Sequence, residues 1–595
     1  MNSTKWVCTN GKDPKSLSNQ EYLREFAQGL CNPAVVVPGI AGSKLIVEIN
    51  CKIFKDNNPA AFKSCGWSTC TGTSILTPKT EYRMWIPGEL APMSIATGLD
   101  GNRKCFNAVM GFDSSEVMQG GKLTERKGLK VVVEGTSPGT KTKAIGKCAW
   151  EAISNLGLGG KADETKGFAG FLTFLENAGY KNGVNIQALP YNWRLDFKEN
   201  DLKTRFTKVI TEMYNNLGKK LVIYAHSFGN YQTVLNLSKM SQQDKDKMVA
   251  RYMALGPPFL GAVQTLRMVF GLDNSFSQDV GIIKLGITGS MFKQTIALLK
   301  GFYNLMPKDA FRRLKDRPFM QGIQARIDAE KHGYNIITNT VVDLLPGPME
   351  SCVLGFSTRD EFCKFGLLDM TTSGYILDTP INHDTVEDLL EQYGVIDGAK
   401  EIYNSVKNEL FEVITNPGVQ TNLVFTSTTH TTYQFTFDEN PRLKTSKDVY
   451  VAPTFEKTAY GDGQVLTTSA VTAALKWADD FEAKQPGAKP VNIIEMCSVW
   501  NRRESVFEPG TKSVEKSAYF GYECGCGGTP HSPSDGKDCD HVSFIGDPKF
   551  YHFMLNSAMD GVAQVQSPTT EAFENQSNEW LANYENNCLL IMNND

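Results

Sequence analysis

One serine in this 595-residue sequence stands in a setting where it could attack a substrate. Ser227 lies in "LVIYAHSFGN", where an apolar run is followed by a helical pattern. In a G-x-S-x-G nucleophile elbow, small residues two before and two after the serine let strand and helix approach, so the hydroxyl stands free. Ala225 and Gly229 occupy those positions. Alanine crowds the turn by one methyl group without forbidding it, so Ser227 is a candidate nucleophile, and the alternative is an ordinary helix start.

A nucleophilic serine needs a carboxylate and a base, which follow it in the chain order Asp, then His, after this kind of elbow. Among the seven histidines, His541 precedes a helical pattern near the end of the chain and His552 lies within that pattern. A loop histidine can reach over a sheet edge, so we predict His541 as the base. Asp462 of "YGDGQ" is the predicted acid, although Asp-Gly is also common in turns. Three other aspartates are weaker candidates for the acid: Asp384, Asp479 and Asp480.

Several short apolar runs must position these side chains. Each run is followed by turn residues, which is typical of strands in a parallel sheet covered on both faces. Helical patterns alternate with the runs, and this alternation predicts an α/β fold. The segments that contain the runs are residues 33–47, 184–193, 219–239 and 248–262.

Net charge, apolar runs and cysteine content limit which partners and cellular locations are expected for this protein. The formal net charge is −4, so there is no global basic field to attract nucleic acid. No run reaches the roughly 18 apolar residues of a transmembrane helix, which predicts a peripheral membrane contact. The first residues lack the apolar segment of a secretory signal. Fourteen cysteines, several of them clustered, nevertheless favour an oxidising compartment, and we expect a secreted protein or one of the endomembrane or lysosomal lumen.

Seven sequence blocks spread over residues 33 to 555 carry a family resemblance. They are VVVPGIAGSKLIVEI, LPYNWRL, LVIYAHSFGN, ALGPPFLGA, NLVFTSTTHTTYQF, YGDGQVLTTSA and DHVSFIGDPKFY. Their order and spacing resemble those of the lecithin:cholesterol acyltransferase family, which includes lysosomal phospholipase A and the phospholipid:diacylglycerol acyltransferases. The resemblance implies an α/β-hydrolase-type, mostly parallel sheet with an inserted lid and a helical cap. It places the nucleophile at Ser227, the acid at Asp462 and the base at His541.

The resemblance also implies an oxyanion hole made by the backbone N–H groups of Ala41 and Phe228. One such donor is worth about 2.7 to 4 kcal/mol in the transition state. At three positions the chain departs from the usual family residues. Ala225 replaces glycine in the elbow, Asn192 replaces aspartate, and Gln464 replaces threonine after the Gly-Asp-Gly turn.

A disulfide-closed lid is implied after the first strand, with Cys51 paired to Cys65 or Cys70. In the family this segment meets the lipid surface, which exposed tryptophan and aliphatic side chains favour at interfaces. The residues implied for lipid contact are Trp67, Met84, Trp85 and Ile86. The alternative is a stapled surface loop with partly buried tryptophans.

The predicted domain boundaries follow from these segments. The hydrolase core comprises residues 31–50, 146–260 and 421–595; residues 51–145 form the lid, and residues 261–420 form the cap.

The function implied is serine-dependent lipid acyl transfer. An acyl ester of a glycerophospholipid, at a membrane or lipoprotein-like surface, is cleaved through an acyl-serine intermediate and passed to water or a lipid alcohol such as a sterol. No cofactor or metal is implied. One alternative is a catalytically inactive relative that binds lipid or a partner protein. Another is a zinc site, which would remove His541 as a base, with four ligands: Cys524, Cys526, Cys539 and His541.

Overall fold

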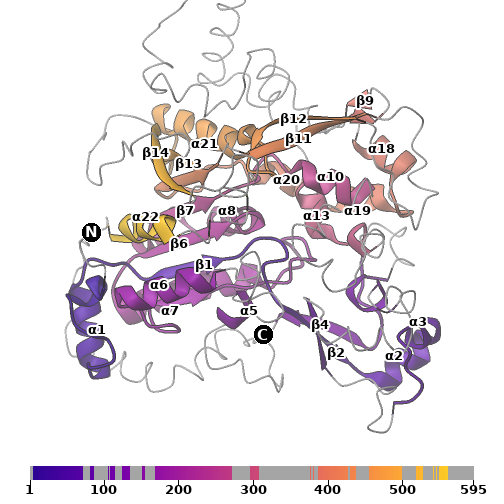
Figure 1. Ribbon diagram of the computed structural model, residues 1–595, viewed down its shortest axis with the longest axis horizontal. Helices are drawn as coiled ribbons and strands as arrows, with labels where there is room; N and C mark the ends of the chain where they lie inside the picture. The colour runs from indigo at the N-terminus through magenta and orange to yellow at the C-terminus, as the bar shows by residue number, and fades with distance from the viewer. Residues whose placement is uncertain are drawn as a thin grey trace, which may run out of the picture.

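The structure is a computed structural model organised around a seven-stranded parallel sheet (Figure 1). It describes residues 5–70, 81–85, 105, 107–113, 123–133, 150–153, 168–270, 295–306, 375–376, 379–380, 386–426, 429–436, 455–498, 518–526, 541, 545 and 548–559. The strand order is β14-β13-β10-β7-β6-β1-β5, and every neighbouring pair is parallel. The prediction of a mostly parallel α/β sheet is therefore confirmed. The strands are β1 (Ala34–Val37), β5 (Ile186–Ala188), β6 (Leu221–His226), β7 (Val249–Leu255), β10 (Thr421–Phe425), β13 (Val491–Ser498) and β14 (Ala518–Cys526).

Alternate residues of these strands enter two different apolar clusters. On β1, Val35 and Val37 belong to one cluster, while Ala34 and Val36 belong to the other. Such a strand reads as a continuous apolar run because both faces of the sheet are covered. The first cluster includes residues of α7 (Leu202–Leu217), α8 (Phe228–Lys239) and α21 (Thr467–Glu482). The second includes residues of α6 (Ala169–Ala178) and α22 (Pro548–Met559).

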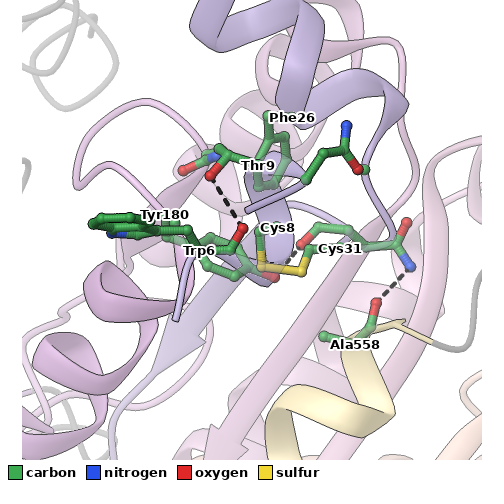
Figure 2. The surroundings of a disulfide bond; sticks show 12 residues. Trp6, Cys8, Thr9, Phe26, Cys31, Tyr180 and Ala558 are labelled. Carbon is green, nitrogen blue, oxygen red and sulfur yellow. Dashed lines mark hydrogen bonds between the residues drawn. A yellow bond between two sulfur atoms is a disulfide. The ribbon is translucent and has the colours of Figure 1, made fainter. Parts of the chain in front are cut away.

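The residues just before β1 are joined both to the N-terminal segment and to the last described helix. The N-terminal segment contains η1 (Val7–Thr9) and α1 (Asn19–Gln28), and a Cys8–Cys31 disulfide ties it to the start of the sheet (Figure 2). Asn32 Nδ2 donates to the Ala558 carbonyl of α22 at 3.0 Å. Helix α22, which follows His541 in the chain, is thereby attached to the core.

The predicted lid segment has a small antiparallel sheet of its own, in the order β3-β2-β4. Its strands are β2 (Leu45–Ile49), β3 (Glu81–Trp85) and β4 (Leu129–Val133), and its helices are α2 (Cys51–Asn57) and α3 (Pro59–Ser64). Of the two pairings left open for Cys51, the disulfide with Cys70 forms, while Cys65 pairs with Cys105. Strand β2, placed with the core by the predicted boundary, pairs with the strands of this segment.

The remaining elements lie between or beside the main strands. The two antiparallel ribbons are β8 (Tyr375–Ile376) with β9 (Thr379–Pro380), and β11 (Thr429–Thr436) with β12 (Phe455–Gly461). The helices are α5 (Trp150–Ile153), α9 (Gln242–Met248), α10 (Val263–Phe270), α13 (Lys300–Asn304), α18 (Val386–Tyr393), α19 (Ala399–Val406) and α20 (Glu409–Glu412). Among the residues that the structure describes, no helix combines the length and apolar character needed to span a bilayer.

Candidate active site

Ser227 lies between β6 and α8, at the carboxyl edge of the parallel sheet. Its backbone has φ 52° and ψ −127°, a conformation that is strained for a residue other than glycine and typical of a nucleophile elbow. Gly229 must be glycine, because a Cβ there would lie 2.5 Å from the Pro38 carbonyl oxygen. Ala225 is fully buried and pairs with Val37 and Ala254 in the sheet. The methyl group that departs from the family pattern therefore fits within the sheet.

The structure brings Ser227, His541 and Asp462 into one hydrogen-bonded series. The Ser227 Oγ lies 2.7 Å from His541 Nε2, and His541 Nδ1 lies 2.6 Å from Asp462 Oδ2. The three residues are at most 6% exposed, so water screens these contacts little. A base next to a hydroxyl, with a carboxylate behind the base, is the arrangement that activates a serine and stabilises the imidazolium that forms.

Asp462 is held in place by the turn in which it lies, directly after β12. Its Oδ1 accepts from the backbone N–H groups of Gln464 at 3.0 Å and Val465 at 2.7 Å, which is common aspartate turn chemistry. The His541 N–H donates to the Asp462 carbonyl at 2.8 Å, so backbone and side chain of the two residues are both joined. Because Gln464 contributes its main-chain N–H, its departure from the family residue leaves this contact intact.

The alternative of a zinc site conflicts with the position of His541. Both ring nitrogens face protein partners, one a carboxylate and the other a hydroxyl. A metal needs one of these nitrogens as a ligand, so zinc binding would break the hydrogen-bonded series. Cys524 and Cys526 lie on β14, where only the backbone is described, and Cys539 is outside the described residues.

The turn after β1 packs directly against Ser227. A Cβ on Gly39 would lie 2.8 Å from the Ser227 Cβ, so glycine permits this approach. Ala41 follows in the left-handed region with φ 59°, and Phe228 is the first residue of α8. The positive end of the α8 dipole therefore lies beside the Ser227 hydroxyl, where a developing negative charge would be stabilised.

Two aromatic residues of "LPYNWRL" support this turn, a role that the motif alone did not indicate. The Tyr191 hydroxyl donates to the Pro38 carbonyl at 2.9 Å, and Trp193 Nε1 donates to the Ser43 carbonyl at 3.0 Å. Tyr191 and Trp193 are buried, so these bonds hold the turn from within the core. The signal available in the sequence was a pair of aromatic residues with polar groups, at the end of the predicted strand segment 184–193.

Asn192, where the family usually has aspartate, contacts a buried arginine. Its Oδ1 accepts from Arg194 Nε at 3.1 Å. Arg194 is fully buried, and its guanidinium also forms an ion pair with Glu125 of the lid segment and donates to the Met110 carbonyl. Burial lowers the pKa of Arg194, and the Glu125 carboxylate opposes that shift. Glu125 of the lid segment thus supplies a carboxylate that pairs with Arg194.

Of the four residues implied for lipid contact, Trp67 is the one whose side chain the structure describes. Trp67 is 4% exposed and packs on Phe54 and Phe62, because an aromatic cluster forms the interior of the lid segment. It therefore does not lie on an exposed face as the lid reading expected. Met84 and Trp85 lie on β3, where only the backbone is described, and Ile86 is outside the described residues.

A different side chain of the lid segment is exposed. Ile53 on α2 is 45% exposed, and the flanking Lys52 and Lys55 are exposed as well. An aliphatic side chain beside lysines is a combination that suits the surface of a membrane.

His226, next to Ser227 in the chain, also contacts the site, through the main chain of His541. Its Nε2 lies 2.8 Å from the His541 carbonyl oxygen, and the two rings are 4.9 Å apart. Its position beside the serine is visible in the sequence, but a contact across 315 residues is not.

Comparison with known proteins points to one family. The model of the family described as "Lecithin:cholesterol acyltransferase" matches residues 130–503, a range that includes Ser227 and Asp462 and ends before His541. "Lysosomal phospholipase A and acyltransferase" of Bos taurus is 33% identical over 136 residues, which are 23% of this chain and 33% of that protein. "Phosphatidylcholine-sterol acyltransferase" of Mus musculus is 23% identical over 257 residues, 42% of this chain and 49% of that protein. The matches thus span one third to one half of these relatives.

A solved structure titled "The crystal structure of Tle4-Tli4 complex" is 12% identical, with a TM-score of 0.36 over 90% of this chain and 99% of that one. A likeness of this strength carries no conclusion.

Proposed function

Because this chain belongs to the lecithin:cholesterol acyltransferase family, we propose that it transfers a fatty acyl group from a glycerophospholipid through an acyl-serine intermediate on Ser227. The observation that supports the proposal is the hydrogen-bonded series from Asp462 through His541 to the Ser227 hydroxyl. The matching relatives carry names of phospholipid acyl-transfer enzymes, which agrees with this substrate class.

In the first half-reaction, Ser227 Oγ attacks the ester carbonyl carbon while its proton moves to His541 Nε2. The Asp462 carboxylate stabilises the resulting imidazolium. The backbone N–H groups of Phe228 and Ala41 are the proposed donors to the oxyanion. The ester C–O bond then breaks, and His541 returns the proton to the leaving lysophospholipid oxygen.

In the second half-reaction, an acceptor hydroxyl takes the place of the lysophospholipid. His541 removes its proton, its oxygen attacks the acyl carbon, and the bond to Ser227 Oγ breaks as the proton returns to the serine. Water as acceptor releases a fatty acid, and a lipid alcohol such as a sterol yields an ester. The chemistry is the same in both cases, so the ratio of products depends on how well the site excludes water.

We infer that the lid segment contacts the lipid surface through Ile53 and the neighbouring lysines. Vesicle co-sedimentation with phosphatidylcholine liposomes tests this inference. Ile53→Ser is expected to weaken binding by about 10- to 100-fold, since the burial of one aliphatic side chain contributes about 1.5 to 3 kcal/mol. Leu30→Ser is the matched control, because Leu30 is 52% exposed and lies outside the lid segment. Equal losses in the two variants would contradict a specific role for the lid.

A luminal or extracellular location is part of the proposal. The disulfides Cys8–Cys31, Cys51–Cys70 and Cys65–Cys105 support it, since such bonds persist in oxidising compartments.

The decisive experiment gives the purified protein liposomes of acyl-labelled phosphatidylcholine, with and without a sterol. Free fatty acid alone identifies a phospholipase, and a labelled sterol ester identifies a transferase. Ser227→Ala is expected to abolish both products, because it removes the attacking oxygen. Undiminished product in this variant would overturn the assignment of the nucleophile.

A fluorophosphonate probe separates the proposed enzyme from an inactive relative. Covalent labelling of Ser227 is expected, and it should disappear in Ser227→Ala. A folded wild-type protein that binds liposomes without being labelled would be the lipid-binding relative instead.

A further inference from the structure

The histidine beside the nucleophile contacts the main chain of the proposed base. We propose that His226 is a positioning residue, whose Nε2–H holds the His541 carbonyl and thereby fixes the imidazole between Asp462 and Ser227. This inference rests on the proposed function and adds a residue to it. His226 does not contact the reacting atoms in this role; it acts through His541.

The contact geometry supports a directional hydrogen bond. His226 Nε2 lies 2.8 Å from the His541 carbonyl oxygen, and the His226 residue is 6% exposed. The His541 N–H donates to the Asp462 carbonyl, so both main-chain polar atoms of His541 are tied to residues of the site. A ring whose backbone is held at two points has little freedom to swing away from the nucleophile.

The acceptor determines the tautomer of His226. A carbonyl oxygen can only accept, so the proton of a neutral His226 must be on Nε2. Burial and the neighbouring His541 lower the pKa of His226 to about 3. His226 therefore stays neutral at working pH and donates continuously. It does not compete with His541, 4.9 Å away, for the proton taken from Ser227.

Packing on other sides fixes the ring itself. The Phe168 ring packs edge-on against the His226 ring, with 6.3 Å between the two ring centroids. A Cβ on Gly39 would lie 3.2 Å from His226 Nδ1 and 2.8 Å from the Ser227 Cβ. The turn that packs against the nucleophile thus also packs against His226. Moving this ring would disturb the turn and His541 together.

The test compares two replacements of matched length. In His226→Gln, the amide nitrogen is as many bonds from the backbone as Nε2 and can donate to the same carbonyl. His226→Met has the same length and no donor. The rate of Ser227 labelling by a fluorophosphonate is measured against pH, and kcat and KM are measured on phosphatidylcholine liposomes.

We expect His226→Met to label about 10- to 100-fold more slowly than His226→Gln, because a small displacement of a catalytic group has effects of this size. The loss should fall on kcat and leave KM unchanged. The inflection of the pH profile should also move to lower pH in the Met variant. The reason is that an imidazole displaced from the Asp462 carboxylate loses the charge partner that favours its protonated form.

Equal rates and equal inflections in the Gln and Met variants would show that His226 only fills space, and would overturn the inference. If the Met variant does not fold, His226→Asn replaces it, because its amide nitrogen falls one bond short of Nε2. Asn is expected to behave like Met, and an Asn rate equal to that of Gln contradicts the hydrogen bond. Failure of the wild type to label refutes the proposed function instead, so the two failures are distinguishable.

Discussion

Two groups of polar residues in this protein differ in the hydrogen-bond donors and charge partners that surround their buried carboxylates. In the proposed catalytic cluster, defined as Ser227, His541 and Asp462 and called the Ser227 cluster, three N–H donors face the two oxygens of Asp462. In the Glu409 cluster, the Glu409 carboxyl accepts from Asn304 Nδ2 at 3.2 Å and has Lys198 Nζ at 3.3 Å. The other members of the Glu409 cluster are Asp196, Glu199 and Lys300.

The two groups differ in how far hydrogen bonds and nearby cations offset the cost of burying a carboxylate. Burial, together with the nearby Asp196 carboxylate, raises the pKa of Glu409 to about 7, although Lys198 opposes the shift. Glu409 can therefore change its protonation near neutral pH. The Glu409 cluster connects the core residue Asp196 with α13 and α20, so its protonation bears on how the predicted cap attaches to the core.

The largest expected effect comes from neutralising Asp462, the proposed acid of the Ser227 cluster. Asp462→Asn should lower kcat by about 10⁴-fold, as in other Ser-His-Asp sites, because the amide favours the wrong imidazole tautomer. The measurement is the initial rate of fatty acid or ester release from phosphatidylcholine liposomes. Far-ultraviolet circular dichroism provides the control for folding. A loss below tenfold would mean that Asp462 is not the orienting acid.

The next effect concerns the cation of the Glu409 cluster. Lys300→Met should reduce the free energy of unfolding by about 3 to 5 kcal/mol, because the buried Asp196 loses the ammonium 3.5 Å away. Denaturant unfolding with the disulfides intact measures it. Lys198→Met is the matched control; Lys198 is 60% exposed and should contribute about 0 to 1 kcal/mol. Similar losses in both variants would contradict the distinction between buried and exposed partners.

The smallest expected effect is a pH dependence of stability. The folded-state pKa of Glu409 is raised to about 7 from 4.5, so its stabilising contribution is complete below pH 4.5 and is lost as the pH rises toward 7. The loss is on the order of 3 kcal/mol. Glu409→Gln removes this titration, so the variant should match the wild type near pH 4.5 and exceed it above pH 7. The measurement is the melting temperature of the wild type and of Glu409→Gln across this pH range. A difference between the two melting temperatures that does not change with pH would refute the assignment of the titration to Glu409.

Local patterns predicted much of the fold. The continuous apolar runs indicated β1, β6 and β7, because strands covered on both faces need no alternation. The small residues around Ser227 indicated the elbow for a similar reason, since steric limits at a tight turn are local. The burial of Trp67 was missed, because it depends on how Phe54 and Phe62 pack around it.

The other features that the sequence did not predict also depend on contacts between distant segments. The carboxylate that pairs with Arg194 comes from Glu125, 69 residues away, and no pattern near either residue indicates the pair. Likewise, "LPYNWRL" drew attention through its asparagine, while the support of the turn after β1 comes from Tyr191 and Trp193.

The sequence by itself determined the elbow at Ser227, the need for glycine at position 229 and, through the family resemblance, the three candidate residues. Only the tertiary structure decided that Ser227 Oγ and His541 Nε2, which are 314 residues apart in the chain, lie 2.7 Å from each other. It also decided that His226 Nε2 contacts the His541 carbonyl oxygen. The physical reason is that strain and steric fit act between neighbours in the chain, whereas hydrogen bonds depend on ångström-scale distances that the packing of the whole domain sets.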